Sequence, residues 1–218
     1  MQIRIEAIYK TKKGMQTKLE TEYMSLAEGL IIAEDMEKTG RIHQLMFIDT
    51  EDIAWSKKEL HKLTEEVKEE PHDITVYFDG GFDQATKKSG LGAVIYYKQN
   101  NRNYRMRKNA LVEQLVSNNE AEYAALHLSM QELEALGVSR LPVTFIGDSQ
   151  VVVNQLNDEW PCFEPELNKW MDRVEEIADR MRIKPTYQLI PRTKNKEADQ
   201  LADQALKGID IFSNAELA

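Results

Sequence analysis

The chain has 218 residues, 42% of them apolar and 30% charged, so it is long enough and apolar enough to fold around a core. Its formal net charge of −9 excludes a uniformly basic surface, so any contact with nucleic acid must use a local patch. The single cysteine, Cys162, excludes a disulfide framework and a cysteine-rich zinc site. No apolar run approaches the about 18 residues of a membrane span, and the N-terminus is too polar for a signal peptide. We therefore expect a cytoplasmic protein, a monomer without membrane association.

Residues 1–70 predict a small α+β module with the element order ββαβα. Strands are expected at residues 2–9, 17–23 and 42–48, with one helix beginning at Ser25 and another over residues 56–67. Glu28, three residues after Ser25, indicates a capping box at the start of the first helix. A charged run that contains Pro71 marks the boundary with the second module.

The sequence leaves the role of this first module open. Its first turn carries three lysines that would suit a phosphate backbone, namely Lys10, Lys12 and Lys13. Its aromatic side chains are expected to fill the core of the small sheet instead: Tyr9, Tyr23 and Phe47.

Residues 71–208 predict a second, larger module. Strands are expected at residues 74–79, 92–97, 104–112, 143–146 and 186–190. Helices are expected at residues 118–136, 149–156, 166–182 and 195–206. Strands in a meander, followed by alternating strands and helices, indicate an α/β domain with a mixed sheet and helices on its faces. Residues 209–218 are predicted to form a C-terminal tail.

Two acidic residues stand directly at the ends of apolar strands. Asp79 precedes two glycines, and Asp148 follows the strand at residues 143–146. Side chains at the carboxyl ends of strands project into the crevice where α/β sheets bind ligands. Asp148 can alternatively cap the next helix. On the last helix, Asp199 lies beside an apolar stripe and can equally be a solvated charge.

Glu120 and Glu122 need to be distinguished, because two residues on a helix are separated by about 200°. Glu120 stands three residues after Ser117, where it can complete a capping box. Glu122 shares its helix face with Ala125 and Leu126, which indicates that this face packs against the protein. A carboxylate on such a face needs a partner, unless the position reaches solvent. The sequence thus favours Glu122 as the functional acid.

Four such carboxylates would suit Mg²⁺, which takes oxygen ligands in near-octahedral geometry. Two ions about 3.5–4 Å apart can activate water and stabilise the leaving oxygen of a phosphodiester. Without cations, the four charges would repel one another and raise some of their pKa values.

Four stretches of the second module carry these acids in a characteristic order: residues 75–81, 117–123, 147–150 and 195–202. Together they resemble the motifs of type 1 ribonuclease H, especially its shorter bacterial and archaeal forms. The resemblance implies a five-stranded mixed sheet flanked by helices. It also implies a two-metal endonuclease that cuts the RNA strand of RNA/DNA hybrids with Mg²⁺, or Mn²⁺ in its place.

The same resemblance assigns individual roles. It implies that the metal-binding catalytic residues are Asp79, Glu122, Asp148 and Asp199. It also places Asn118, Asn119 and Gln150 at the RNA strand, where amide groups suit the ribose 2′-OH. These amides can alternatively serve as caps and helix-end hydrogen bonds.

The chain also departs from the family pattern. The loop before the last helix lacks the histidine of many members, and we expect Arg192 to contact phosphate or product instead. The long basic protrusion of some members is missing, and the residues that could replace it, or form a plain solvated hairpin, are Lys98, Arg102, Arg105, Arg107 and Lys108. These departures keep an alternative open, a non-catalytic ribonuclease H-like module that binds nucleic acid or a protein.

Overall fold

The computed structural model describes residues 1–217, without the side chains of residues 66–68. The chain forms two compact units, Met1–Glu66 and Val67–Ala218. The helix α2 (Lys57–Glu69) runs across the division between them. Among the described residues, no helix combines the length and the apolar character needed to cross a bilayer.

The first unit is a small antiparallel sheet packed against helices. Its strand order is β2-β1-β4-β5, built on β1 (Gln2–Lys10), β2 (Gln16–Glu20) and β4 (Ile42–Asp49). Two further strands, β3 (Met24–Ser25) and β5 (Ala54–Trp55), have two residues each. The helix α1 (Leu26–Lys38) begins with the predicted capping box, in which the Ser25 and Glu28 side chains each accept from the other's backbone N–H.

The prediction that Tyr9, Tyr23 and Phe47 fill the core of this unit is wrong for the two tyrosines. Phe47 is fully buried beside Ile3 and Ile5, but Tyr23 is 45% exposed. Tyr9 is only half-buried, and its hydroxyl accepts a hydrogen bond from Arg41 at 2.7 Å. The inward positions of β1 fall on small and aliphatic side chains before Tyr9, so this ring lies at the end of the strand.

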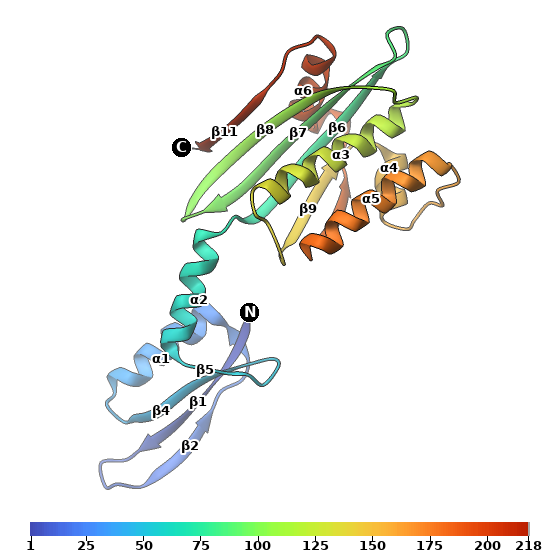
Figure 1. Ribbon diagram of the computed structural model, residues 1–218. Helices are drawn as coiled ribbons and strands as arrows, with labels where there is room; N and C mark the ends of the chain where they lie inside the picture. Colours follow the sequence, from blue (N-terminus) through green and yellow to red (C-terminus); the bar gives the residue numbers. More distant parts are fainter. Residues whose placement is uncertain (218) are drawn as a thin grey trace. The chain divides into compact units, whose positions relative to one another are not determined.

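The second unit contains a mixed sheet in the order β10-β9-β6-β7-β8-β11 (Figure 1). Its strands are β6 (His72–Asp83), β7 (Lys88–Gln99), β8 (Arg102–Glu113), β9 (Pro142–Gly147), β10 (Lys184–Leu189) and β11 (Phe212–Leu217). Both β9 and β10 run parallel to β6, whereas β7, β8 and β11 are antiparallel to their neighbours. The mixed α/β fold class is confirmed.

Helices cover both faces of this sheet (Figure 1). One face packs against the helices α3 (Asn118–Ala135), α4 (Gln150–Leu156) and α5 (Pro165–Met181). The other face carries α6 (Lys196–Leu206), which follows the short 3₁₀ helix η1 (Arg192–Lys194). Gly90 and Gly92 of β7 lie directly beneath backbone carbonyls of α6, where a Cβ atom would collide. These two glycines therefore allow α6 to approach the sheet closely.

The predicted tail is in fact a sixth strand, so the expected count of five strands is corrected. β11 pairs along β8 and satisfies backbone groups that a sheet edge would leave open. Glu216 pairs with Arg102 at 2.9 Å, Ser213 accepts from Arg107 at 3.1 Å, and Phe212 lies under the Lys108 ammonium.

The remaining two basic residues of the hairpin also have acidic partners. Lys98 pairs with Asp73 at 3.0 Å, and Arg105 pairs with Glu197 at 3.1 Å. The cluster proposed from the sequence as a local basic surface is therefore engaged within the protein.

Candidate active site

Asp79 occupies the α6 face of β6, two positions beyond Tyr77. Its side chain is only 6% exposed. The prediction that Asp79 ends the strand is wrong, because pairing with β7 continues β6 through the two glycines to Asp83. Gly80, the residue after Asp79, passes so close to the backbone of α3 that a Cβ atom would collide with Ala121. This close approach allows a residue on α3 to reach the strand that carries Asp79.

Glu122 on α3 is that residue. It is 3% exposed, and one carboxylate oxygen accepts a hydrogen bond from the Gly80 N–H at 3.2 Å. The helix register therefore points Glu122 toward β6, as the sequence predicts.

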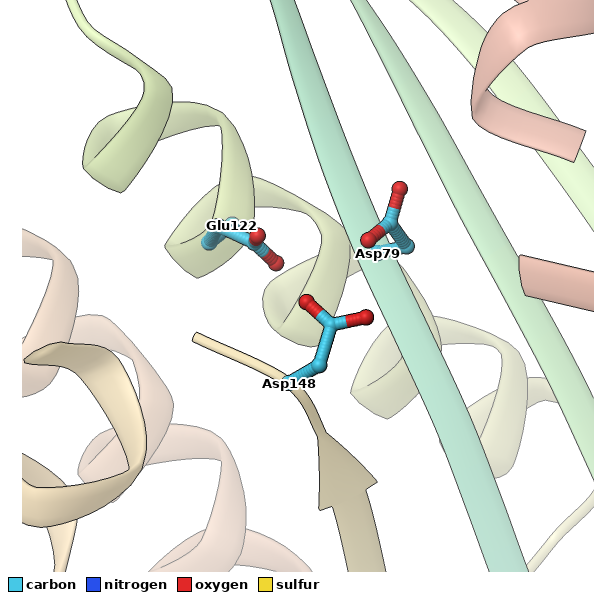
Figure 2. Close-up of side chains that lie close together, drawn as sticks. All are labelled: Asp79, Glu122 and Asp148. Carbon is cyan, nitrogen blue, oxygen red and sulfur yellow. The ribbon is translucent and has the colours of Figure 1, made fainter. Parts of the chain in front are cut away.

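Asp148 completes the cluster from the end of β9. Because β9 runs parallel to β6 and pairs with it as far as Tyr77 and Ile146, Asp148 at the carboxyl end of β9 lies beside Asp79. One oxygen from each of Asp79, Glu122 and Asp148 lies within 4.8 Å of the other two. Figure 2 shows the three carboxylates converging from strand, helix and loop.

The electrostatics of this cluster are unfavourable without a cation. Burial, with the charges of Asp148 and Asp199, raises the pKa of Asp79 to about 7. Burial and the same kind of repulsion hold the pKa of Glu122 well above its usual range, and burial also raises the pKa of Asp148. All three carboxyl groups of the cluster therefore ionise less readily than isolated carboxyl groups in water.

The residues fit a divalent metal ion. Asp148 Oδ2 is buried and has no hydrogen-bond partner among the described residues. A buried carboxylate oxygen requires a donor or a cation, and an all-oxygen donor set suits a hard divalent ion. The three acids line a cavity of about 300 Å³, large enough for ions with their water ligands.

Asp199 lies in the same cavity but outside the tight cluster. Its Oδ1 accepts from the Arg192 guanidinium, at 2.6 Å from Nη2 and 3.1 Å from Nε. The structure therefore brings three of the four predicted acids together and pairs the fourth with the arginine that we expected at phosphate. Asp203, one turn further along α6, also lines the cavity, although the sequence did not favour it as a site residue.

The predicted amides lie around this cavity. Asn118 is exposed at the start of α3, lines the cavity and accepts a hydrogen bond from Phe82 N–H at 3.3 Å. Gln150 is exposed beside Asp148 and Arg192 in a neighbouring hollow. Asn119 is half-buried and is not among the residues that line either space.

Glu120 has a structural position, but the predicted capping box is only half correct. Ser117 Oγ accepts from the Glu120 N–H at 3.2 Å, as expected. The Glu120 carboxylate instead accepts from Val116 N–H at 2.8 Å and from the Trp170 ring N–H at 3.2 Å. It thereby joins the start of α3 to α5, because a carboxylate has more than one acceptor site.

Asn195 is a residue of this region that the sequence reasoning did not single out by itself. It is 1% exposed, and its side-chain amide donates to the carbonyl of Phe78 at 2.9 Å. Phe78 directly precedes Asp79, so Asn195 joins the start of α6 to the strand that carries this acid. The only local signal was its place at the beginning of the 195–202 stretch.

Comparison with known proteins places this chain in a family. The reverse transcriptase-like family matches residues 77–205. The uncharacterised protein YpeP of Bacillus subtilis is 42% identical over 196 residues, which cover 90% of this chain and 86% of that protein. Ribonuclease HI of Halobacterium salinarum is 34% identical over 93 residues, which cover 41% of this chain and 44% of that protein.

Solved structures agree with the fold of the second unit. The crystal structure of LC11-RNase H1 in complex with an RNA/DNA hybrid matches with a TM-score of 0.55 and 25% identity, covering 62% of this chain and 98% of that one. The shared fold and the extent of the family match lead to one assignment. The chain belongs to the reverse transcriptase-like family and is a type 1 ribonuclease H-like protein.

Proposed function

We propose that the protein is a divalent-metal-dependent endonuclease that hydrolyses the RNA strand of RNA/DNA hybrids. The observation that carries this proposal is the convergence of Asp79, Glu122 and Asp148 from three different elements. Their raised pKa values and the unpartnered Asp148 oxygen make the cluster costly unless a cation binds. The bound hybrid of a structural neighbour supports the choice of substrate.

Asp79, Glu122 and Asp148 would hold Mg²⁺, or Mn²⁺ in its place, and Asp199 would join them once Arg192 has moved away. When bound, a pair of such ions supplies activation of the attacking water and neutralises charge at the scissile phosphate. The Arg192 side chain is 78% exposed, so its guanidinium can leave Asp199 and bind a phosphate of the substrate or product.

The amides supply discrimination between RNA and DNA in this proposal. Asn118 and Gln150 stand at the rim of the cavity and beside it, with Asn119 next to Asn118 on α3. Amide groups both donate and accept, as the ribose 2′-OH does. Cleavage should therefore require a 2′-OH next to the scissile bond.

The test is cleavage of a labelled RNA/DNA hybrid with Mg²⁺ or Mn²⁺, with Asp79→Asn as the inactive control. We expect metal-dependent cleavage of the RNA strand and no cleavage of the matching all-DNA duplex. Equal cleavage of both duplexes would indicate a general nuclease. Absence of cleavage with either ion would favour the alternative, a non-catalytic module that binds nucleic acid or protein.

A further inference from the structure

A second cavity lies on the α6 face of the sheet, outside the catalytic cluster. Its volume is about 420 Å³, within the range of small-ligand sites. Strands β6 and β7 contribute Thr75, Tyr77 and Tyr96, and the segment from the end of η1 to the first turn of α6 contributes Lys194, Asn195 and Glu197. We call these six residues the tyrosine pocket.

The beginning of α6 separates the tyrosine pocket from the catalytic cavity. Lys194 and Glu197 line the tyrosine pocket, whereas Arg192 and Asp199 line the catalytic cavity. Tyr77 and Asp79 lie on the same face of β6, about 7 Å apart along the strand, with Tyr77 lining one cavity and Asp79 the other. They are therefore neighbouring but distinct sites.

The aromatic part of the tyrosine pocket is held in place by a partly buried polar network. The Tyr77 and Tyr96 rings meet edge to face, with centroids 5.9 Å apart and an interplanar angle of 81°. The Tyr96 hydroxyl donates to Glu197 at 2.9 Å, and Glu197 pairs with Arg105 at 3.1 Å. The negative charge of Glu197 is thus neutralised, and the rings form a preorganised surface for a planar group.

The remaining polar groups of the tyrosine pocket are free. Across the described part of the chain, the hydroxyls of Thr75 and Tyr77 have no hydrogen-bond partner, and the Lys194 ammonium has no acidic partner within 4 Å. Asn195 also lines the pocket, but its side-chain amide is engaged toward Phe78 and Asp148 of the catalytic region.

We propose that the tyrosine pocket binds a nucleotide, with the base against Tyr77 and Tyr96 and the phosphate at Lys194. The paired Glu197 and Arg105 cancel, which leaves Lys194 as the uncompensated charge beside the aromatic rings. A planar ring system joined to an anion matches this combination, and base stacking on aromatic side chains tolerates any base. The nucleotide can be free or can be one unit of a single strand.

The test is calorimetric titration of the full-length protein with AMP, in EDTA so that no metal can hold phosphate at the catalytic cluster. Adenosine is the second probe because it lacks the phosphate. Lys194→Ala removes the charge at the pocket, and Lys196→Ala is the matched control, since Lys196 is exposed two residues away and does not line the pocket. Tyr77→Leu removes a ring and keeps an apolar side chain.

We expect Lys194→Ala to weaken AMP binding about tenfold and to leave adenosine binding unchanged. Tyr77→Leu should weaken both ligands, and Lys196→Ala should affect neither by more than about twofold. Should Tyr77→Leu not fold, amide chemical-shift changes of the wild-type protein at Tyr77 and Tyr96 on AMP addition replace it.

The proposal is overturned if AMP shows no saturable binding up to about 5 mM, or if the two lysine variants weaken it equally. A short deoxyadenylate oligonucleotide distinguishes the two sources of the nucleotide. Binding tighter than that of AMP indicates a strand, and weaker binding indicates the free nucleotide. These measurements do not involve cleavage, so their failure would leave the proposed nuclease function unaffected.

Discussion

Replacing Asp79 by asparagine is expected to stabilise the metal-free protein near pH 8 far more than near pH 5. The wild-type carboxyl has a pKa of about 7 when folded, against an ordinary value of 3.8. Between these values the folded state binds more protons than the unfolded state, so the free energy of unfolding falls as the pH rises. Asparagine does not titrate and removes this loss.

The size of the effect follows from the pKa of Asp79. From about pH 5 to its pKa of about 7, the wild-type protein loses about 3 kcal/mol, at 1.36 kcal/mol per pH unit. The stability difference between variant and wild type should grow by that amount. For a protein of this size, it corresponds to an increase of about 6–12 °C in the relative melting temperature.

The assay is thermal and urea unfolding of both proteins in EDTA between about pH 5 and pH 8. Asp83→Asn is the matched control on the same strand, because a hydrogen bond from Thr86 holds the pKa of Asp83 below its usual range. The change in unfolding free energy caused by Asp83→Asn should be constant between about pH 5 and pH 8. A stability difference for Asp79→Asn that does not change with pH would refute the reasoning that the cluster is strained by uncompensated charge.

Four further outcomes are expected. Glu122→Gln should reduce cleavage by at least about a thousandfold through loss of a metal ligand. Glu120→Gln should keep the cleavage rate within about tenfold of the wild-type rate. It should lower the unfolding free energy by about 1 kcal/mol, since the new amide N–H₂ would face a donor. A Glu120→Gln variant without cleavage activity would contradict the assignment of Glu122 as the functional acid. The fragment Val67–Ala218 should fold and cut the hybrid, because all the predicted site residues lie in it; a folded but inactive fragment would implicate the first unit. Deleting residues 212–218 should lower the free energy of unfolding by about 3 kcal/mol, because the backbone hydrogen bonds between β11 and β8 are lost. An unchanged midpoint of urea unfolding would argue against that strand.

Local sequence patterns were sufficient for the order of the longer helices and strands as far as α6 and for the register of α3, but not for the short strands β3 and β5 or for β11. The capping box at Ser25 and Glu28 involves neighbours three residues apart, so it is readable without any tertiary information. The orientation of Glu122 toward β6 follows from the 100° step between helix residues, which also separates it from Glu120. The position of Asp148 directly after β9 follows from the apolar run that precedes it, whereas the end of β6 could not be placed because the strand continues past Asp79 through pairing with β7.

Contacts between distant segments were decided only by the tertiary structure. Residues 209–218 carry no strong strand pattern, and β11 forms because the open edge of β8, about a hundred residues earlier, offers hydrogen-bonding groups to it. The tyrosine pocket likewise requires β6, β7 and α6 to meet. The periodicity of apolar residues in the sequence does not predict these contacts, because they depend on how elements pack against one another rather than on the conformation of any one element.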